Sequence, residues 1–216
     1  MRHILGPRLW DLYSLSYDCL VTYVLKNVRK TYVKELLELT AADKEIENIL
    51  IVGVGTGQEL SLIDTSIPVT GIDYSKGMLA RTKKWIQEGQ KVDLHRMDAH
   101  RLDFPDQSFH RVLMPLIVAV SQNPLKVLKE GERVLKPGGR LVIFDKFLHK
   151  DQKPTWGRKI LNFFFQMVAT DININFHQWL PGLESRLVKE IPSIFSGMFK
   201  IFVLEKKTDR DNHSSK

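Results

Sequence analysis

The feature that most constrains the fold is a short apolar run that ends in a glycine-rich loop. The run reads Ile49-Leu50-Ile51-Val52, and Gly53-Val54-Gly55-Thr56-Gly57 follows it directly. A β-branched run that is apolar throughout predicts a strand buried on both faces of a sheet. The glycines allow the backbone to turn tightly and to approach a ligand without an intervening Cβ. Free N–H groups at the start of the next helix favour an anionic or polar ligand group.

Short apolar runs and helical stretches alternate after this loop. Strands are predicted over residues 69–72, 92–95, 112–120, 141–144, 187–191 and 200–204, and helices over residues 58–63, 76–88, 125–135 and 156–169. A Pro137-Gly138-Gly139 turn is predicted before the strand at 141–144. This alternation predicts an α/β fold, with a mostly parallel sheet covered by helices on both faces.

The flanks of this region are predicted to be helical. Residues 8–39 carry apolar side chains at mixed i+3 and i+4 spacing, with breaks expected near residues 14–16 and Asn27. The predicted polar face of this segment carries Lys26, Arg29, Lys30 and Lys34. We expect an N-terminal helical cap over residues 1–40 that faces the substrate or a membrane, a main domain over 41–205 and a disordered tail over 206–216.

The composition excludes several classes of protein. A 43% hydrophobic share over 216 residues is that of a globular chain, and the single cysteine excludes an intrachain disulfide. The N-terminus does not have the pattern of a signal peptide. The most apolar run, residues 160–169, is shorter than the roughly 20 residues that a membrane span needs. We therefore expect a cytoplasmic protein without a membrane-spanning segment.

The net charge of +7 is unevenly distributed along the chain. Residues 1–40 carry a net +2, residues 41–145 are neutral, and residues 146–216 carry +5. A basic surplus indicates an anionic partner, for which nucleic acid, a lipid surface and an acidic substrate are all candidates.

Two acidic residues follow predicted strands near the glycine loop. Asp73 lies 16 residues after Gly57, at the end of the second strand. A carboxylate there accepts both hydrogen bonds of a ribose diol, although Asp73 alone also fits a helix N-cap. Asp98 follows the third strand, where it is placed to accept a hydrogen bond from an adenine amino group or to hold a turn. Together with the glycine loop, these acids predict nucleoside binding.

The central region resembles the class I S-adenosylmethionine-dependent methyltransferases in the order and spacing of four segments: ILIVGVGTG, GIDYSKGML, MDAHRLDFPDQSF and VLKPGGRLV. The resemblance covers about residues 48–147. It implies a Rossmann-like seven-stranded sheet, S-adenosyl-L-methionine as the cofactor and no metal. The implied cofactor-binding residues are Gly53, Val54, Gly55, Gly57, Asp73, Tyr74, Met78, Asp98 and Ala99. Dinucleotide dehydrogenases are disfavoured because their glycines run G-x-G-x-x-G, whereas the third glycine here comes one residue earlier.

The chain departs from this family at two positions. Many members carry an acid two residues before the first glycine, where this chain has Ile51. That acid helps to hold the methionine part of the cofactor, so its absence predicts a weaker or reshaped site at that end. The second departure is His110, where the family often has a structural aspartate.

Outside this core, the chain resembles the bacterial phospholipid N-methyltransferases, which convert phosphatidylethanolamine toward phosphatidylcholine. The matching residues are Asp145-Lys146-Phe147-Leu148, the pair Arg158 and Asn162, and Thr170-Asp171-Ile172-Asn173. The resemblance implies methyl transfer to the amine of phosphatidylethanolamine and of its methylated products. The candidate groups for the amine or its proton are Tyr17, Asp145, His149 and Asp171, and those for the lipid phosphate are Lys146 and Arg158.

The basic flanks favour a peripheral position at the anionic inner face of a membrane, where each Lys or Arg contributes about 1 kcal/mol. Three alternatives remain. Leu15-Ser16-Tyr17-Asp18 also resembles quinone methyltransferases, which suggests a quinone or other small apolar acceptor. The pI of about 9.4 suggests an RNA methyltransferase, but an N-P-P-Y-type motif and an RNA-binding module are absent from the sequence, so no nucleic acid partner is expected. Ile51 leaves a non-catalytic binding module possible.

Overall fold

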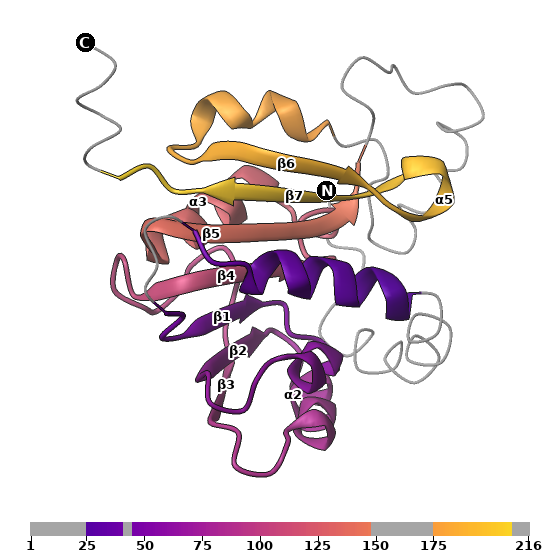
Figure 1. Cartoon of the computed structure of the whole chain (residues 1–216), viewed down its shortest axis with the longest axis vertical. Helices are drawn as coiled ribbons and strands as arrows, with labels where there is room; N and C mark the ends of the chain where they lie inside the picture. The colour runs from indigo at the N-terminus through magenta and orange to yellow at the C-terminus, as the bar shows by residue number, and fades with distance from the viewer. Residues whose placement is uncertain (1–24, 41–44, 148–174, 209–216) are drawn as a thin grey trace.

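The computed structural model describes residues 25–40, 45–147 and 175–208. These residues form one seven-stranded sheet with the strand order β3-β2-β1-β4-β5-β7-β6 (Figure 1). The strands are β1 (Ile49–Val52), β2 (Val69–Asp73), β3 (Val92–Arg96), β4 (Phe109–Pro115), β5 (Leu135–Lys146), β6 (Arg186–Pro192) and β7 (Phe199–Glu205). Strands β1 to β5 pair in parallel, and β7 is antiparallel to both β5 and β6. The predicted mostly parallel sheet is confirmed.

Helices cover both faces of the sheet. They are a helix over residues 25–37, α2 (Lys76–Thr82), α3 (Pro124–Val134) and α5 (Ile194–Gly197), with 3-10 turns η1 (Gln58–Leu62), η2 (Lys83–Trp85), η3 (Phe176–Gln178) and η4 (Leu180–Gly182). Alternate strand residues enter two separate cores: Leu50 packs in the core on the α3 side, and Ile51 packs with the helix over 25–37. In Figure 1 that helix crosses in front of the sheet and α3 lies behind it.

Two strand boundaries differ from the prediction by five residues or more. β4 ends at Pro115 rather than at residue 120, because Leu116 adopts a φ of 56° and turns the chain out of the sheet. β5 begins at Leu135, six residues earlier than predicted, and the expected turn lies inside it as an irregularity. There Gly138 has a φ of 76°, and the pairing of β5 with β4 shifts register.

Two helices are also shorter than predicted. The helix predicted over residues 58–63 is the 3-10 turn η1 (Gln58–Leu62), and α2 ends at Thr82 and tightens into η2 instead of continuing to residue 88. The side-chain amides of Gln87 and Gln90 donate to the carbonyl of Leu60 at 3.0 and 3.2 Å. These bonds hold the chain after η2 against the end of η1 and so divert it from the helix axis.

The helix over residues 25–37 is continuous, so the break predicted at Asn27 is wrong. Its apolar stripe, which includes Leu25, Val28, Tyr32 and Leu36, is buried in the core on one face of the sheet. The helices predicted N-terminal to residue 25 and over 156–169 lie outside the described residues. Within the described part of the chain, no helix is long and apolar enough to cross a membrane. Lys206, placed by prediction in the tail, is buried and donates to the carbonyls of Glu132 and Leu135.

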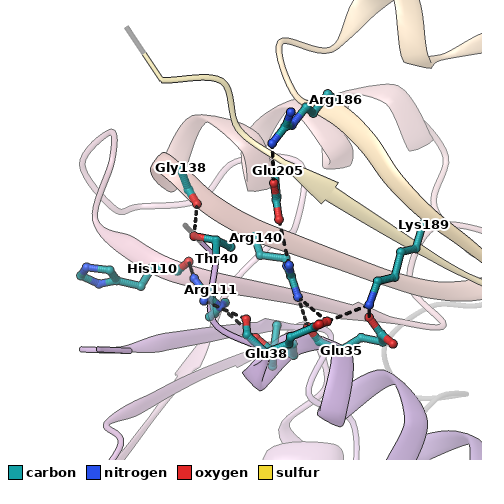
Figure 2. Close-up of polar contacts among 11 residues, drawn as sticks. Glu35, Glu38, Thr40, His110, Arg111, Gly138, Arg140, Arg186, Lys189 and Glu205 are labelled. Carbon is teal, nitrogen blue, oxygen red and sulfur yellow. Dashed lines mark hydrogen bonds and ion pairs between the residues drawn. The ribbon is translucent and has the colours of Figure 1, made fainter. Parts of the chain in front are cut away.

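Three cations meet the C-terminal end of the helix over residues 25–37 (Figure 2). The fully buried Arg111 of β4 donates to the carbonyls of Leu36 and Glu38 at 2.8 and 3.1 Å. Arg140 of β5 donates to the Glu35 carbonyl and the Glu38 carboxylate. Lys189 of β6 donates to the carboxylates of Glu35 and Glu38. These cations satisfy the last helix carbonyls and oppose the negative end of the helix dipole. We call Glu35, Glu38, Arg111, Arg140 and Lys189 the helix-end network.

The network makes one carboxylate unusually acidic. Hydrogen bonds from Lys189 and Arg140 lower the pKa of Glu38 from 4.5 to about 2. A folded-state pKa below the unfolded one contributes stability that is present above pH 4.5 and is lost as the pH falls toward 2. Substituting Lys189→Met should therefore raise the Glu38 pKa toward 4.5, as read from its carboxyl ¹³C shift in an NMR titration. An unchanged Glu38 pKa would contradict the contact with Lys189.

Candidate active site

A cavity of about 520 Å³ lies at the carboxyl ends of strands β1 to β5. Its walls come from the segments that follow these strands, among them 53–56, 73–75, 97–100, 115–117 and 145–146. The sheet order reverses between β1 and β4, and in open α/β sheets ligands bind in the crevice at such a point. The volume falls in the range of small-molecule sites, about 300–1,000 Å³.

The glycine loop forms one wall of the cavity. Gly53 and Gly55 adopt φ values of 75° and 56°, which other residues rarely tolerate. A Cβ on Gly53 would lie 3.1 Å from the Cβ of Ile117, so glycine keeps this wall open. Gly57 does not line the cavity. A Cβ there would lie 2.4 Å from Cγ2 of Thr82, so the structure gives Gly57 a packing role against α2, and its predicted ligand contact stays a prediction.

Asp73 binds the glycine loop to the start of α2. Its Oδ2 accepts from the Gly55 N–H and its Oδ1 from the Ser75 N–H, both at 2.9 Å. The N-cap of α2 is Ser75, whose hydroxyl accepts from Met78, so Asp73 is not the N-cap. Each carboxylate oxygen has a second lone pair, and Asp73 lines the cavity. The carboxylate is thus held at the cavity wall by backbone donors, and its bond to a ribose diol stays a prediction.

Asp98 belongs to a chain of polar side chains at another wall. Its Oδ1 accepts from the N–H of His100 and contacts Nδ1 of the ring at 2.7 Å, and Nε2 of the ring lies 2.8 Å from the Ser121 hydroxyl. Burial opposes ionisation of Asp98, but the bonds from His100 outweigh it and lower the pKa of the carboxyl. His100 and Ser121 also line the cavity, and the sequence analysis missed both.

Asp145 and Lys146 end β5 at the cavity. The carboxylate of Asp145 accepts from the N–H groups of Ala119 and Lys146 at 2.7 and 2.8 Å, and burial raises its pKa. These bonds hold the loop after β4, and because Asp145 lines the cavity its role toward the amine or its proton stays a prediction. Burial lowers the pKa of Lys146, against the opposing effect of Asp145, and its Nζ lies 5.6 Å from the centroid of the Phe199 ring.

The helix over residues 25–37 supplies a wall that sequence reasoning did not foresee. Arg29 was expected on the exposed face beside three lysines, but it is buried and its Nε donates to Oε1 of Glu59 at 3.0 Å. Tyr32, fully buried, donates its hydroxyl to the same oxygen. All three residues line the cavity. Arg29 and Tyr32 lie about 30 residues before Glu59, so no local pattern predicts their contact. The only sequence signal for it was the acid Glu59 close after the glycine loop.

The remaining predicted residues either line the cavity, lie away from it, or fall outside the described ranges. Val54, Tyr74, Met78 and Ala99 line the cavity with the residues already described. His110 donates its N–H to Asn48 at 3.0 Å, in keeping with a structural position away from the cavity wall. The other predicted residues lie outside the described ranges: Tyr17, His149, Arg158 and Asp171.

The donor and acceptor set of the cavity fits a nucleoside. Asp73 and Asp98 present carboxylates from neighbouring strand ends, which suits a ribose diol and an amino group. Ile72, Met78 and Ile117 add apolar surface between them, which suits a purine ring. Fold and site together define a nucleoside-binding α/β protein of the Rossmann-like type.

Comparisons with known proteins identify the family. A family model described as a methyltransferase domain matches residues 50–143. Phosphatidylethanolamine N-methyltransferase of Cereibacter sphaeroides is 41% identical over 109 residues, which are 49% of this chain and 53% of that protein. Ubiquinone/menaquinone biosynthesis C-methyltransferase of Desulfotalea psychrophila is 33% identical over 146 residues, 65% of this chain and 58% of that protein. The matches thus span between half and three-fifths of these relatives.

A solved structure supports the fold. Geranyl diphosphate C-methyltransferase of Streptomyces coelicolor, solved with Mg²⁺, geranyl diphosphate and S-adenosyl-L-homocysteine, aligns with a TM-score of 0.66 at 12% identity. The alignment covers 85% of this chain and 80% of that one. Residues 50–143 are thus a methyltransferase domain of the class I S-adenosylmethionine-dependent type, and S-adenosylmethionine is the cofactor of that family.

Proposed function

We propose that this protein transfers methyl groups from S-adenosylmethionine to the amine of phosphatidylethanolamine and of its methylated products, toward phosphatidylcholine. The observation that carries this proposal is the 41% identity over 109 residues with a phosphatidylethanolamine N-methyltransferase. Lys146, the predicted partner of the lipid phosphate, lines the same cavity as Asp73 and Asp98, which supports the proposal.

Methyl transfer requires the protein mainly to orient the amine and the methyl group toward each other. The bound cofactor supplies a methyl group on a sulfonium, whose sulfur is already a good leaving group. The amine must be neutral and in line with that methyl group, so orientation and exclusion of water carry much of the rate. In this chain Asp73 and Asp98 fix the nucleoside, and Asp145 holds the loop after β4 through the Ala119 N–H. Tyr17, His149 and Asp171 remain predicted partners of the amine or its proton.

A membrane surface is the proposed place of reaction. Lys26, Lys30 and Lys34 are exposed and follow one another at i+4 spacing on the face of the helix opposite its buried stripe. The helix that presents this basic face also carries Arg29 and Tyr32 to the cavity wall. Binding to an anionic leaflet would therefore place the cavity near the headgroups.

A quinone acceptor is the second candidate. Residues of this chain are 33% identical to a ubiquinone/menaquinone C-methyltransferase over a longer stretch, 146 residues. Such an acceptor would need neither a cation for phosphate nor an anionic surface, so the two functions differ in what the reaction should require.

The deciding experiment uses labelled S-adenosylmethionine with mixed vesicles of phosphatidylethanolamine and phosphatidylglycerol, and in parallel a demethylated quinol. We expect label in the amino lipid, and activity that falls between 0.1 and 1 M salt as the Debye length shrinks from about 10 to 3 Å. Replacing Lys26, Lys30 and Lys34 together by Gln should weaken vesicle binding and activity several-fold. Label in the quinol alone would reject the phospholipid proposal.

A matched control variant is available on the same chain. Lys83, Lys84 and Lys91 are equally exposed but belong to the neutral central region. Changing these three to Gln removes the same charge and should leave vesicle binding close to that of the unchanged protein. Equal losses in both triple variants would point to net charge rather than to the face of the helix.

A further inference from the structure

The Arg29–Glu59 pair is a buried ion pair that keeps hydrogen-bonding capacity on the cavity side. The side chains of Arg29 and Glu59 are 9% and 8% exposed, and both border the cavity. Their mutual hydrogen bond uses Nε of Arg29 and Oε1 of Glu59, and Tyr32 donates to the same Oε1. Among the described residues, no further hydrogen bond reaches Oε2 of Glu59, and the guanidinium of Arg29, which has five N–H donors, interacts only with Glu59 and Tyr32.

The electrostatics keep both charges in place. Burial opposes the charge of Arg29, but the Glu59 carboxylate outweighs it and raises the pKa of the guanidinium. Burial and Glu59 together hold the pKa of Tyr32 well above its ordinary value, so its hydroxyl remains a donor. Both side chains line the cavity, so a ligand bound there can hydrogen-bond to the remaining oxygen of Glu59 and to the guanidinium of Arg29.

The ligand that completes this pair must carry opposite charges a few ångströms apart. A zwitterionic α-amino acid group has an ammonium for Oε2 of Glu59 and a carboxylate for the planar fork of Arg29. The pair lies beside Gly53 to Thr56 on the cavity wall. Ile51, fully buried in β1, supplies no polar group there.

We propose that Glu59 and Arg29 bind the amino-acid end of S-adenosylmethionine, Glu59 through the α-ammonium and Arg29 through the α-carboxylate. This inference deepens the proposed function and rests on it only for the identity of the cofactor. It assigns to η1 and to the helix over 25–37 the polar contacts that Ile51 does not make. Tyr32 acts as a positioning residue because it holds Oε1 of Glu59.

The test compares two ligands that differ only at that end. S-adenosylhomocysteine carries the amino-acid group, and 5′-methylthioadenosine lacks it. By calorimetry, Glu59→Gln, which keeps an acceptor for Arg29 and Tyr32, should weaken S-adenosylhomocysteine about 10- to 100-fold and leave 5′-methylthioadenosine within about threefold. Arg29→Met should act in the same direction, with its melting temperature measured to detect loss of folding.

The outcomes are distinct from those of the phospholipid proposal, because these measurements need no methyl acceptor. Equal losses for both ligands would assign Glu59 a purely structural role and overturn the inference, as would unchanged affinity for S-adenosylhomocysteine. Lys26→Met, on the exposed face of the same helix, is the matched control and should alter neither affinity. If the protein fails to methylate phosphatidylethanolamine but the variants still discriminate between the two ligands, the phospholipid proposal is rejected and the role of Glu59 and Arg29 in cofactor binding stands.

Discussion

Substituting Asp73→Ala should abolish measurable binding of S-adenosylhomocysteine, with a loss of at least about 100-fold. Two effects combine. The variant removes the acceptor that we predict for both ribose hydroxyls, and hydrogen bonds to a charged group contribute about 1.5–3 kcal/mol each. It also frees the N–H groups of Gly55 and Ser75, which the carboxylate holds at 2.9 Å. Isothermal calorimetry measures the change directly.

The control for this variant is another acid on the neighbouring strand. Asp93 lies on β3, where it pairs in register with Thr70 of β2. Its side chain is exposed and does not line the cavity. Asp93→Ala should leave the affinity within about twofold, in line with surface substitutions that change little. Retained binding in Asp73→Ala would show that the cofactor does not use this carboxylate and would remove the basis of the nucleoside assignment.

The strands around the glycine loop were predictable because local pattern and tertiary environment agree there. β1 has the predicted bounds, and β2 and β3 each extend one residue further than predicted. The side chains of β1 and most of those of β2 are buried, so the apolar pattern and the burial coincide there. β3 is the edge strand, and its side chains are partly or fully exposed. The candidate cofactor residues followed from the same logic, since the ends of parallel strands meet at one edge.

Other features depend on contacts that no local pattern contains. The run from residue 112 to 120 is apolar, and only Pro115 within it signals a break, directly before the positive φ of Leu116 that ends β4. Arg29 occupies a helical position next to lysines, and only Glu59, 30 residues later, makes it a wall of the cavity. The periodicity therefore predicted the helix correctly but put Arg29 on its exposed face, whereas Arg29 is buried at the cavity.

Substituting Arg111→Met should be the most destabilising single change in the helix-end network, at about 3 kcal/mol or more. Arg111 is fully buried, and its guanidinium satisfies the carbonyls of Leu36 and Glu38 that close the helix over 25–37. Methionine keeps much of the volume but leaves these acceptors without their donor, at about 1–3 kcal/mol each where they stay buried. Urea unfolding measures the loss as a shift in the free energy of unfolding.

Arg186 provides the comparison, because its side chain is 65% exposed and pairs only at the surface with Glu205. Arg186→Met should cost no more than about 1 kcal/mol. The same helix carries Leu25, Arg29 and Tyr32 to the cavity, so Arg111→Met should also weaken S-adenosylhomocysteine binding and speed amide exchange over residues 25–37. A destabilised variant with unchanged affinity would separate the anchoring of this helix from the binding of the cofactor, whereas joint loss would establish that the sheet holds the helix in place for the site.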